Sequence, residues 1–261
     1  MSLNNTLLAV RNLSAEFPGQ AGVLDNISFS LHQGEVLGII GESGSGKSVL
    51  ARTLLRLEAP ARITAGSILL DGQDVAGKNQ QEMRAIRGRK IALAVQDPRS
   101  AMDPVFRMES QLREVMQAAG VGRQKKSMQQ NEIYCRLSEV GISSPRERCR
   151  QYPHQWSRGM LQRAQLVMLF STNARVLILD EVTSALDPTV TLEILDLIRR
   201  LRQERNAGII LITHDTAVVR ELCDRAAVMQ QGRMVESGPA AEMLGSPSHP
   251  YTRELVAGAG C

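Results

Sequence analysis

The chain has 261 residues, 43% of them hydrophobic, so it can bury a core near the upper size of one undivided domain. Its formal net charge is +4, but acidic and basic residues are interspersed, which favours a solvated surface over a nucleic-acid-binding face. No segment approaches the roughly 20 apolar residues that cross a bilayer, and the first residues do not resemble a signal peptide. We therefore expect a protein that reaches a membrane only through a partner.

The cysteines are scattered along the chain, without a CxxC spacing or a Cys/His cluster: Cys135, Cys149, Cys223 and Cys261. This spacing gives no sign of a zinc site and favours reduced thiols in a cytosolic compartment.

Apolar runs rich in β-branched residues predict strands in the first and last thirds of the chain. In chain order they are 7–13, 23–31, 35–40, 67–72, 90–95, 175–180, 208–213, 225–230 and 233–237. The runs at 175–180 and 208–213 are continuously apolar, as parallel strands covered on both faces are. Gln231-Gly232 marks a hairpin turn between the last two strands.

Between the two sets of strands, from about Asp103 to Leu166, the pattern changes to helices punctuated by Gly120, Gly141 and Pro145. We expect an α/β core over 1–97 and 167–245, an inserted helical subdomain over 98–166 and a short C-terminal extension over 246–261.

The segment GESGSGKS, residues 41–48, stands between a predicted strand and a predicted helix. It has the GxxxxGK[ST] pattern of a phosphate-binding loop in the required context. The glycines let backbone N–H groups face one concavity, where the helix N-terminus adds partial positive charge. Lys47 is placed to reach the β and γ phosphates, and the Ser48 hydroxyl to ligate Mg²⁺. A flexible glycine turn would explain neither the Lys-Ser ending nor the helix that follows.

Further functional groups are predicted at the carboxyl ends of the parallel strands, where open α/β sheets bind ligands. Asp180 ends the strand VLILD and is expected to hold Mg²⁺, and Glu181 is the candidate general base. His214 follows the strand at 208–213 and is a candidate for contact with the γ-phosphate. Gln96 follows the strand at 90–95 and precedes the helical subdomain, so it is a candidate for carrying the nucleotide state into that subdomain.

Taken together, these segments resemble the ATP-binding cassette (ABC) family of transport ATPases over nearly the whole chain, in the family's order. The resemblance implies a P-loop (RecA-like) α/β core, an antiparallel β-subdomain and an inserted α-helical subdomain, forming one nucleotide-binding domain over 1–261. Residues 41–48 are similar to the Walker A loop, VLILDE to Walker B, Gln96 to the Q-loop, Ser184–Asp187 to the D-loop and His214 to the switch histidine.

The resemblance assigns residues to ATP and Mg²⁺. The catalytic residues it implies are Glu181 and His214. The ATP-binding residues are Phe17, Gly41, Glu42, Ser43, Gly44, Ser45, Gly46, Lys47, Ser48, Gln96, Ser157, Gly159 and Asp180. The Mg²⁺-binding residues are Ser48, Gln96 and Asp180. Phe17 matches the aromatic residue that stacks on adenine, although a core position explains it equally well.

Two segments narrow the resemblance to importers. QDPRSAMDP, residues 96–104, and SHPYTRELV, residues 248–256, resemble the ATPases of oligopeptide, dipeptide and nickel importers. The short C-terminus is more similar to the nickel or metal-chelate type, and too few clustered cysteines are present to predict an iron-sulfur cluster. The implied location is the cytoplasmic face of the inner membrane, beside two permease subunits, with an extracytoplasmic solute-binding protein as an indirect partner and no nucleic acid.

In the family two ATPase domains meet head to tail, so WSRGMLQ, residues 156–162, would serve the partner's ATP. Arg158 replaces the first glycine of this signature. Two interpretations stay open: the arginine changes the partner's site, or its side chain points to solvent. The intact catalytic set beside an altered signature leads us to expect a heterodimer with a paralogous ATPase and unequal sites, although a second copy of this chain is also a possible partner.

Two other functional classes are alternatives to the importer. A cassette ATPase acting on nucleic acid would bind it in a salt-sensitive way. A regulatory module that holds ATP without hydrolysing it is disfavoured by Glu181 and His214.

Overall fold

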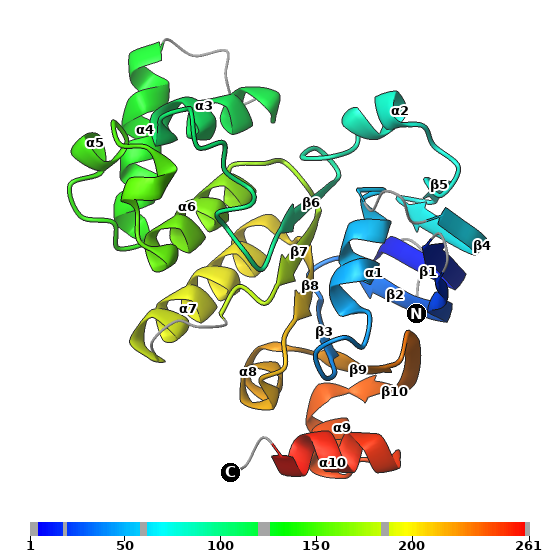
Figure 1. Ribbon diagram of the computed structural model, residues 1–261. Helices are drawn as coiled ribbons and strands as arrows, with labels where there is room; N and C mark the ends of the chain where they lie inside the picture. The colour runs from blue at the N-terminus through cyan, green and yellow to red at the C-terminus, as the bar shows by residue number, and fades with distance from the viewer. Residues whose placement is uncertain (1–4, 18–19, 58–61, 120–125, 184–187, 259–261) are drawn as a thin grey trace.

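The computed structural model describes residues 5–17, 20–57, 62–119, 126–183 and 188–258 (Figure 1). Two sheets and a group of helices make up the described fold. The D-loop prediction, 184–187, lies outside the described residues.

The central sheet has six strands in the order β10-β9-β3-β8-β7-β6. Their bounds are β3 Val36–Ile40, β6 Ile91–Ala94, β7 Val176–Asp180, β8 Gly208–Ile212, β9 Arg225–Gln230 and β10 Arg233–Pro239. All neighbours are parallel except β9 and β10, which form an antiparallel pair. Every residue of β3, β7 and β8 is buried, so the continuous apolar runs do form strands covered on both faces.

A second, antiparallel sheet has the order β2-β1-β4-β5. Its strands are β1 Thr6–Phe17, β2 Gln20–His32, β4 Arg62–Leu70 and β5 Gln73–Asp74. Helix α1, Lys47–Leu54, packs between the two sheets: Leu50 and Leu54 share one buried cluster with Leu8 of β1 and Ile178 of β7. This packing fixes the phosphate loop, which precedes α1, against both sheets.

The helical subdomain lies apart from the antiparallel sheet, at the upper left of Figure 1. It contains α3 Met108–Ala118, α4 Lys126–Glu139, α5 Pro145–Arg148, a 3₁₀ helix at Pro153–Gln155, and α6 Arg158–Phe170. Leu161 of α6 belongs to the subdomain's own core, whereas Leu169 of α6 packs on the central sheet. Helix α6 therefore joins the two cores, and the predicted boundary between 166 and 167 falls inside it.

The remaining helices are α2 Gln80–Arg84, α7 Pro188–Arg205, α8 Thr216–Leu222, α9 Ala240–Gly245 and α10 Pro250–Gly258. Helices α7 and α8 cover the face of the central sheet opposite to α1, through Ile194, Ile198 and Leu222. In the part of the chain that the structure describes, no helix is both long and apolar enough to cross a membrane. The short elements α2, α5 and β5 lack a clear apolar period and were not predicted from the sequence.

Candidate functional site

The phosphate loop, residues 41–48, follows β3, and its last two residues, Lys47 and Ser48, begin α1. Two of its glycines are required by geometry. At Gly41, with φ of 156°, a Cβ atom would lie 2.2 Å from the backbone oxygen of Met229. Gly46 precedes the helix with φ of 103°, in the left-handed region that favours glycine. The close approach of β9 and the turn into α1 therefore both depend on glycine.

Lys47 is folded back over its own loop. Its Nζ donates to the carbonyl oxygens of Gly41 and Glu42, both at 2.7 Å, and to the hydroxyl of Ser45 at 3.3 Å. Burial lowers the pKa of Lys47, and the nearby carboxylates of Glu181 and Asp180 raise it in part. Lys47 is thus 5% exposed, and its ammonium group is held inside the loop. Its three hydrogen bonds go to loop oxygens, which the oxygens of a phosphate could replace.

Ser48 and Asp180 meet although 132 residues separate them. The Ser48 hydroxyl donates to Oδ1 of Asp180 at 3.1 Å. Asp180 ends β7 and is 2% exposed, so burial raises its carboxyl pKa, an effect that the Ser48 hydrogen bond partly offsets. A hydroxyl and a carboxylate side by side are the hard oxygen ligands that Mg²⁺ prefers. The residues present therefore fit the predicted metal ion.

Glu181 takes an unusual backbone conformation. Its φ is 49°, and its N–H donates to the carbonyl of Ile212 at 2.9 Å, which fixes it to the end of β8. Gln96 Nε2 donates to Glu181 Oε2 at 2.6 Å, and Nδ1 of His214 lies 3.8 Å from Oε1. Two of the predicted rim residues, Gln96 and His214, therefore approach the carboxylate of a third, Glu181. The sequence placed them on one rim but gave no sign of these contacts.

A pocket of about 350 Å³ holds much of the predicted site. Among its lining residues are Ser43, Gly44, Gly46, Lys47, Ser48, Gln96 and Glu181. It also includes five residues that were not predicted: Gly22, Val23, Val49, Gln231 and Gly232. The β9–β10 turn reaches the loop because Gly232 N donates to the Ser45 carbonyl at 2.9 Å. Phe17, at the end of β1, is half-buried and is not one of the lining residues, so its contact with adenine stays a prediction.

Tyr251 is a further residue that sequence reasoning missed. Its hydroxyl accepts a hydrogen bond from the backbone N–H of Glu42 at 3.0 Å, across 209 residues. The side chain is 6% exposed and packs with Ile40, the last residue of β3. Tyr251 lies in the segment SHPYTRELV, which the sequence offered only as a subfamily feature. The C-terminal helix α10 therefore holds the phosphate loop directly.

The signature segment is built separately from this pocket. Ser157 is the N-cap of α6, and its hydroxyl accepts from Met160 N at 3.2 Å. The preceding Trp156 is buried and donates from Nε1 to the Arg148 carbonyl at 3.2 Å. Ser157 and Arg158 are exposed, Gly159 is half-buried, and none of the three lines the pocket.

Helix α6 is also tied to the region of Gln96. The buried Gln165 amide, oriented to satisfy both bonds, donates to the carbonyl of Val95 and accepts from its N–H, both at 3.0 Å. The residue before Gln96 is thus bonded to the helix that carries the signature.

A sequence profile described as ABC transporter matches residues 24–184, more than half of the chain. The chain belongs to the ABC transporter family. As an ABC ATPase it binds and hydrolyses ATP, which accords with the phosphate loop and the rim carboxylates described above.

Several relatives of this ABC ATPase are named as transport ATP-binding proteins. The oligopeptide transport ATP-binding protein OppD of Lactococcus lactis subsp. cremoris (strain SK11) is 42% identical over 233 residues, covering 88% of this chain and 68% of the relative. The dipeptide transport ATP-binding protein DppD of Bacillus subtilis (strain 168) is 39% identical over 255 residues, covering 96% and 76%.

Solved structures share the fold of this ABC ATPase. The ATP-binding cassette MJ0796, a dimer in a post-hydrolysis state with ADP and Pi, gives a TM-score of 0.78 at 22% identity, covering 89% of this chain and 98% of that one. An ATP-binding subunit of an ABC transporter also gives 0.78, at 24% identity, covering 98% and 100%. The predicted P-loop α/β core with an antiparallel β-subdomain and an inserted helical subdomain is confirmed.

Proposed function

We propose that this ABC ATPase holds ATP in the pocket at residues 41–48 and hydrolyses it with Glu181 as general base. The observation that carries the proposal is the meeting of Ser48 with Asp180, and of Gln96 with Glu181, at the carboxyl edge of the central sheet. Lys47 would exchange its bonds to loop carbonyls for bonds to the β and γ phosphates, which are stronger charge-assisted acceptors.

Ser48 and Asp180 would hold Mg²⁺, with Gln96 as a third predicted ligand. The ion supplies charge neutralisation at the β and γ phosphate oxygens when bound. Asp180 is suited to this role because its buried carboxylate would be stabilised by a cation that takes the place of the Ser48 hydrogen.

Glu181 would accept a proton from the attacking water, and His214 would contact the γ-phosphate. In the structure described here Gln96 occupies one Glu181 oxygen, so this bond has to open before that oxygen accepts a water proton. Because Gln96 precedes the helical subdomain, opening the bond would link the state of the nucleotide to the position of that subdomain.

The exposed signature, residues 156–162, would complete the ATP site of a partner. The partner is either a paralogous ATPase or a second copy of this chain, and the head-to-tail pair places Ser157 and Gly159 against the partner's ATP. The N-terminus of α6, which begins directly after the exposed Ser157, carries partial positive charge and suits an anion. With Arg158 in this position, we propose a heterodimer in which the partner's site differs in turnover from the one on this chain.

The transported solute is proposed from the relatives' names. Because relatives at 42% and 39% identity are named for oligopeptide and dipeptide transport, we propose uptake of short peptides. The prediction of nickel or a metal chelate stays untested, as does the expectation that no iron-sulfur cluster is present. The ATPase would sit on the cytoplasmic face of the inner membrane under two permease subunits, fed by an extracytoplasmic binding protein.

The experiment is co-purification of the tagged chain with its membrane proteins, followed by phosphate release from the reconstituted complex. We expect membrane subunits in the complex and turnover that rises when the peptide-loaded binding protein is added. Salt-sensitive binding to nucleic acid without membrane partners would support the nucleic-acid alternative instead.

A further inference from the structure

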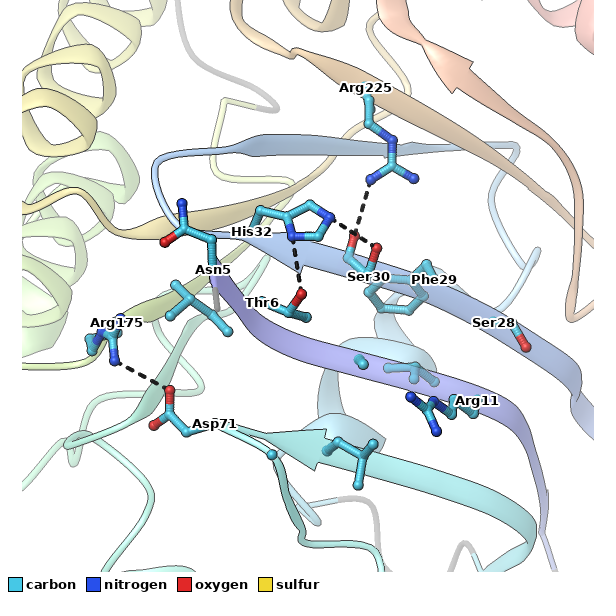
Figure 2. A pocket seen from close by; sticks show the side chains of 15 residues that line it. Asn5, Thr6, Arg11, Ser28, Phe29, Ser30, His32, Asp71, Arg175 and Arg225 are labelled. Atoms are coloured by element: carbon cyan, nitrogen blue, oxygen red, sulfur yellow. Dashed lines mark hydrogen bonds and ion pairs between the residues drawn. The ribbon is translucent and has the colours of Figure 1, made fainter. Parts of the chain in front are cut away.

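A pocket of about 770 Å³ lies on the outer face of the antiparallel sheet (Figure 2). Two of its residues come from the central sheet: Arg175 directly precedes β7, and Arg225 is the first residue of β9. They therefore stand at the amino ends of the parallel strands, whereas Asp180 and Glu181 stand at the carboxyl ends. This pocket is thus separate from the nucleotide site.

Strand alternation gives the pocket a polar floor. Ser28, Ser30 and His32 of β2 line it, while Ile27 and Leu31, at the alternate positions, are fully buried against the core. Phe29, the alternate residue between them, is half-buried and also borders the pocket. The hydroxyl groups and the imidazole therefore face the pocket because the sheet's period sends their neighbours inward.

The pocket lining carries an excess of positive charge. In and beside the pocket, four cationic side chains, Arg11, Arg175, Arg225 and Lys90, meet two carboxylates, Asp71 and Glu35, an excess of two positive charges. Asp71 is shared, since Arg175 lies 3.4 Å and Lys90 3.5 Å from its oxygens. Among the described residues, the Arg11 side chain has no hydrogen bond or ion pair. The arginines are therefore not neutralised by the pocket's own acid.

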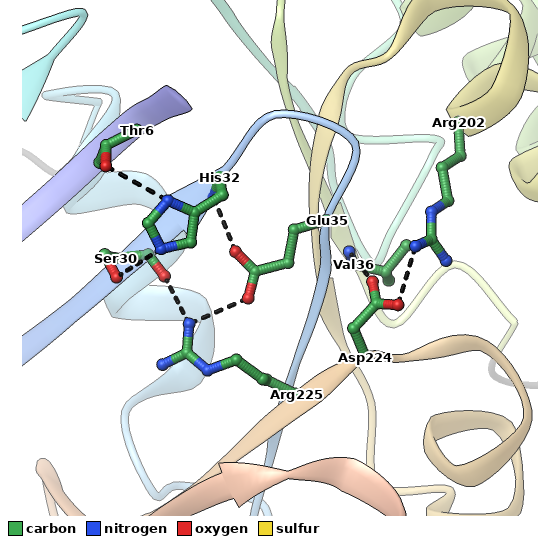
Figure 3. A network of polar contacts seen from close by, with 8 residues as sticks. All are labelled: Thr6, Ser30, His32, Glu35, Val36, Arg202, Asp224 and Arg225. Carbon is green, nitrogen blue, oxygen red and sulfur yellow. Dashed lines mark hydrogen bonds and ion pairs between the residues drawn. The ribbon is translucent and has the colours of Figure 1, made fainter. Parts of the chain in front are cut away.

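One nitrogen of the Arg225 guanidinium group, Nη1, is held by two hydrogen bonds within the protein. Its Nη1 donates to Glu35 Oε1 at 2.9 Å and to the Ser30 carbonyl at 3.3 Å (Figure 3). The other Glu35 oxygen accepts from His32 N at 2.7 Å, so the carboxylate is itself held in place. Among the described residues, Nε and Nη2 of Arg225 have no partner. The side chain is pre-oriented and retains donors for a ligand.

The His32 ring is held between two hydroxyl groups. Nδ1 lies 3.2 Å from Thr6 Oγ1, and Nε2 lies 3.3 Å from Ser30 Oγ. Because a hydroxyl can donate or accept, these contacts hold the ring in either protonation state. An anion entering the pocket thus meets a rigid floor.

We propose that this pocket binds a small phosphate-bearing anion. Planar guanidinium groups match phosphate oxygens in pairs, hydroxyl groups complete the shell, and the local excess of cations over carboxylates favours an anion. The same chemistry is offered by inorganic phosphate and by a phosphate ester, which the probes below distinguish.

The test is calorimetric titration of the full chain with inorganic phosphate and, separately, glycerol 3-phosphate, with saturating Mg-ADP in the phosphate loop. We expect saturable binding near one site per chain. Arg11→Ala and Arg175→Ala each weaken it about tenfold, the cost of one charge-assisted contact. Tighter binding of glycerol 3-phosphate assigns an ester, and equal or tighter binding of phosphate assigns the free ion.

Arg62→Ala is the matched control, because Arg62 begins β4 of the same sheet, is exposed, and does not line the pocket. It removes the same charge and is expected to leave binding unchanged. Thermal unfolding confirms that each variant is folded. No saturable binding of either probe, or equal weakening by Arg62→Ala, would overturn the proposal.

Discussion

This chain contributes two different regions to the proposed ATP sites: the phosphate-loop half, which would hold its own ATP, and the signature half, residues 156–162, which would face the partner's ATP. The two halves differ in how many contacts they make with the rest of the chain. In the phosphate-loop half, polar groups bond to one another across the fold: Ser48 to Asp180, Gln96 to Glu181 and Glu42 to Tyr251. In the signature half, as far as the described residues show, the Ser157 hydroxyl bonds only to Met160 of its own helix turn, and Arg158 is exposed. Under the proposed head-to-tail pairing, the second half would contact ATP only in a complex with another molecule.

Substitutions in the two halves should therefore have different effects. A change in the phosphate-loop half alters this chain's own nucleotide binding or chemistry. A change in the signature half should leave this chain's nucleotide affinity intact and act on turnover in the assembled complex.

Glu181→Gln is expected to have the largest effect on turnover. Loss of the general base should lower phosphate release about 100-fold or more, while ATP affinity is retained because the phosphate loop is unchanged. Phosphate release by the complex and binding of a fluorescent ATP analogue measure the two quantities. Glu204→Gln, an exposed carboxylate on α7, is the control. Undiminished turnover in Glu181→Gln would remove Glu181 from the chemistry.

Asp180→Asn should impair hydrolysis and at the same time stabilise the nucleotide-free chain. Burial raises the carboxyl pKa, so the folded state binds more protons than the unfolded state between the two pKa values, and stability falls as pH rises through that window. Asn removes this cost at neutral pH, raising Tm by about 2–4 °C. The gain should shrink at acidic pH.

Thermal unfolding in the presence of a chelator, across pH, measures the effect of Asp180→Asn. Asp196→Asn, an exposed carboxylate on α7, should give no gain at neutral pH. A lower Tm for Asp180→Asn at neutral pH would contradict the assigned cost of burial.

Tyr251→Phe should raise KM for ATP about fivefold and leave kcat unchanged, because one hydrogen bond worth about 1 kcal/mol no longer holds the phosphate loop. Aromatic packing is kept, so Tm should hardly change. Tyr134→Phe, in the helical subdomain, is the matched control. An unchanged KM with an intact fold would show that the bond does not position the loop.

Arg158→Gly should have the smallest effect, a change of roughly threefold in the partner site's turnover, because crowding and charge attraction at phosphate are comparable in size. This chain's ATP affinity should stay the same. Equal turnover before and after the change would place the side chain in solvent, the second of the two interpretations.

The sequence predicted the features that are determined by short, continuous segments of the chain. The phosphate loop, the strand ending at Asp180 and the position of His214 could all be located because spacing and hydrophobic pattern are properties of short segments. The β9–β10 hairpin was predicted from Gln231-Gly232 for the same reason. The parallel order of the central strands then placed these residues at one edge.

The sequence could not predict contacts between distant segments. The hydrogen bond from Glu42 to Tyr251 spans 209 residues and joins a backbone group to a hydroxyl, so no residue pattern signals it. Val23 and Gly232 enter the pocket because the hairpin packs against β2, which is a result of tertiary packing. Short elements such as α5 have too few residues for a periodic pattern.

Gly159→Asp tests most directly whether the signature half acts on the partner's ATP and not on the ATP bound by this chain. Gly159 lies in the first turn of α6, outside the pocket, and a carboxylate there would repel a partner's phosphate. ATP binding by the isolated chain and phosphate release by the assembled complex are measured on one preparation. We expect this chain's ATP affinity to stay unchanged and the part of the complex's turnover that comes from the partner's site to be lost. Weaker ATP binding by the isolated, folded variant would contradict this expectation.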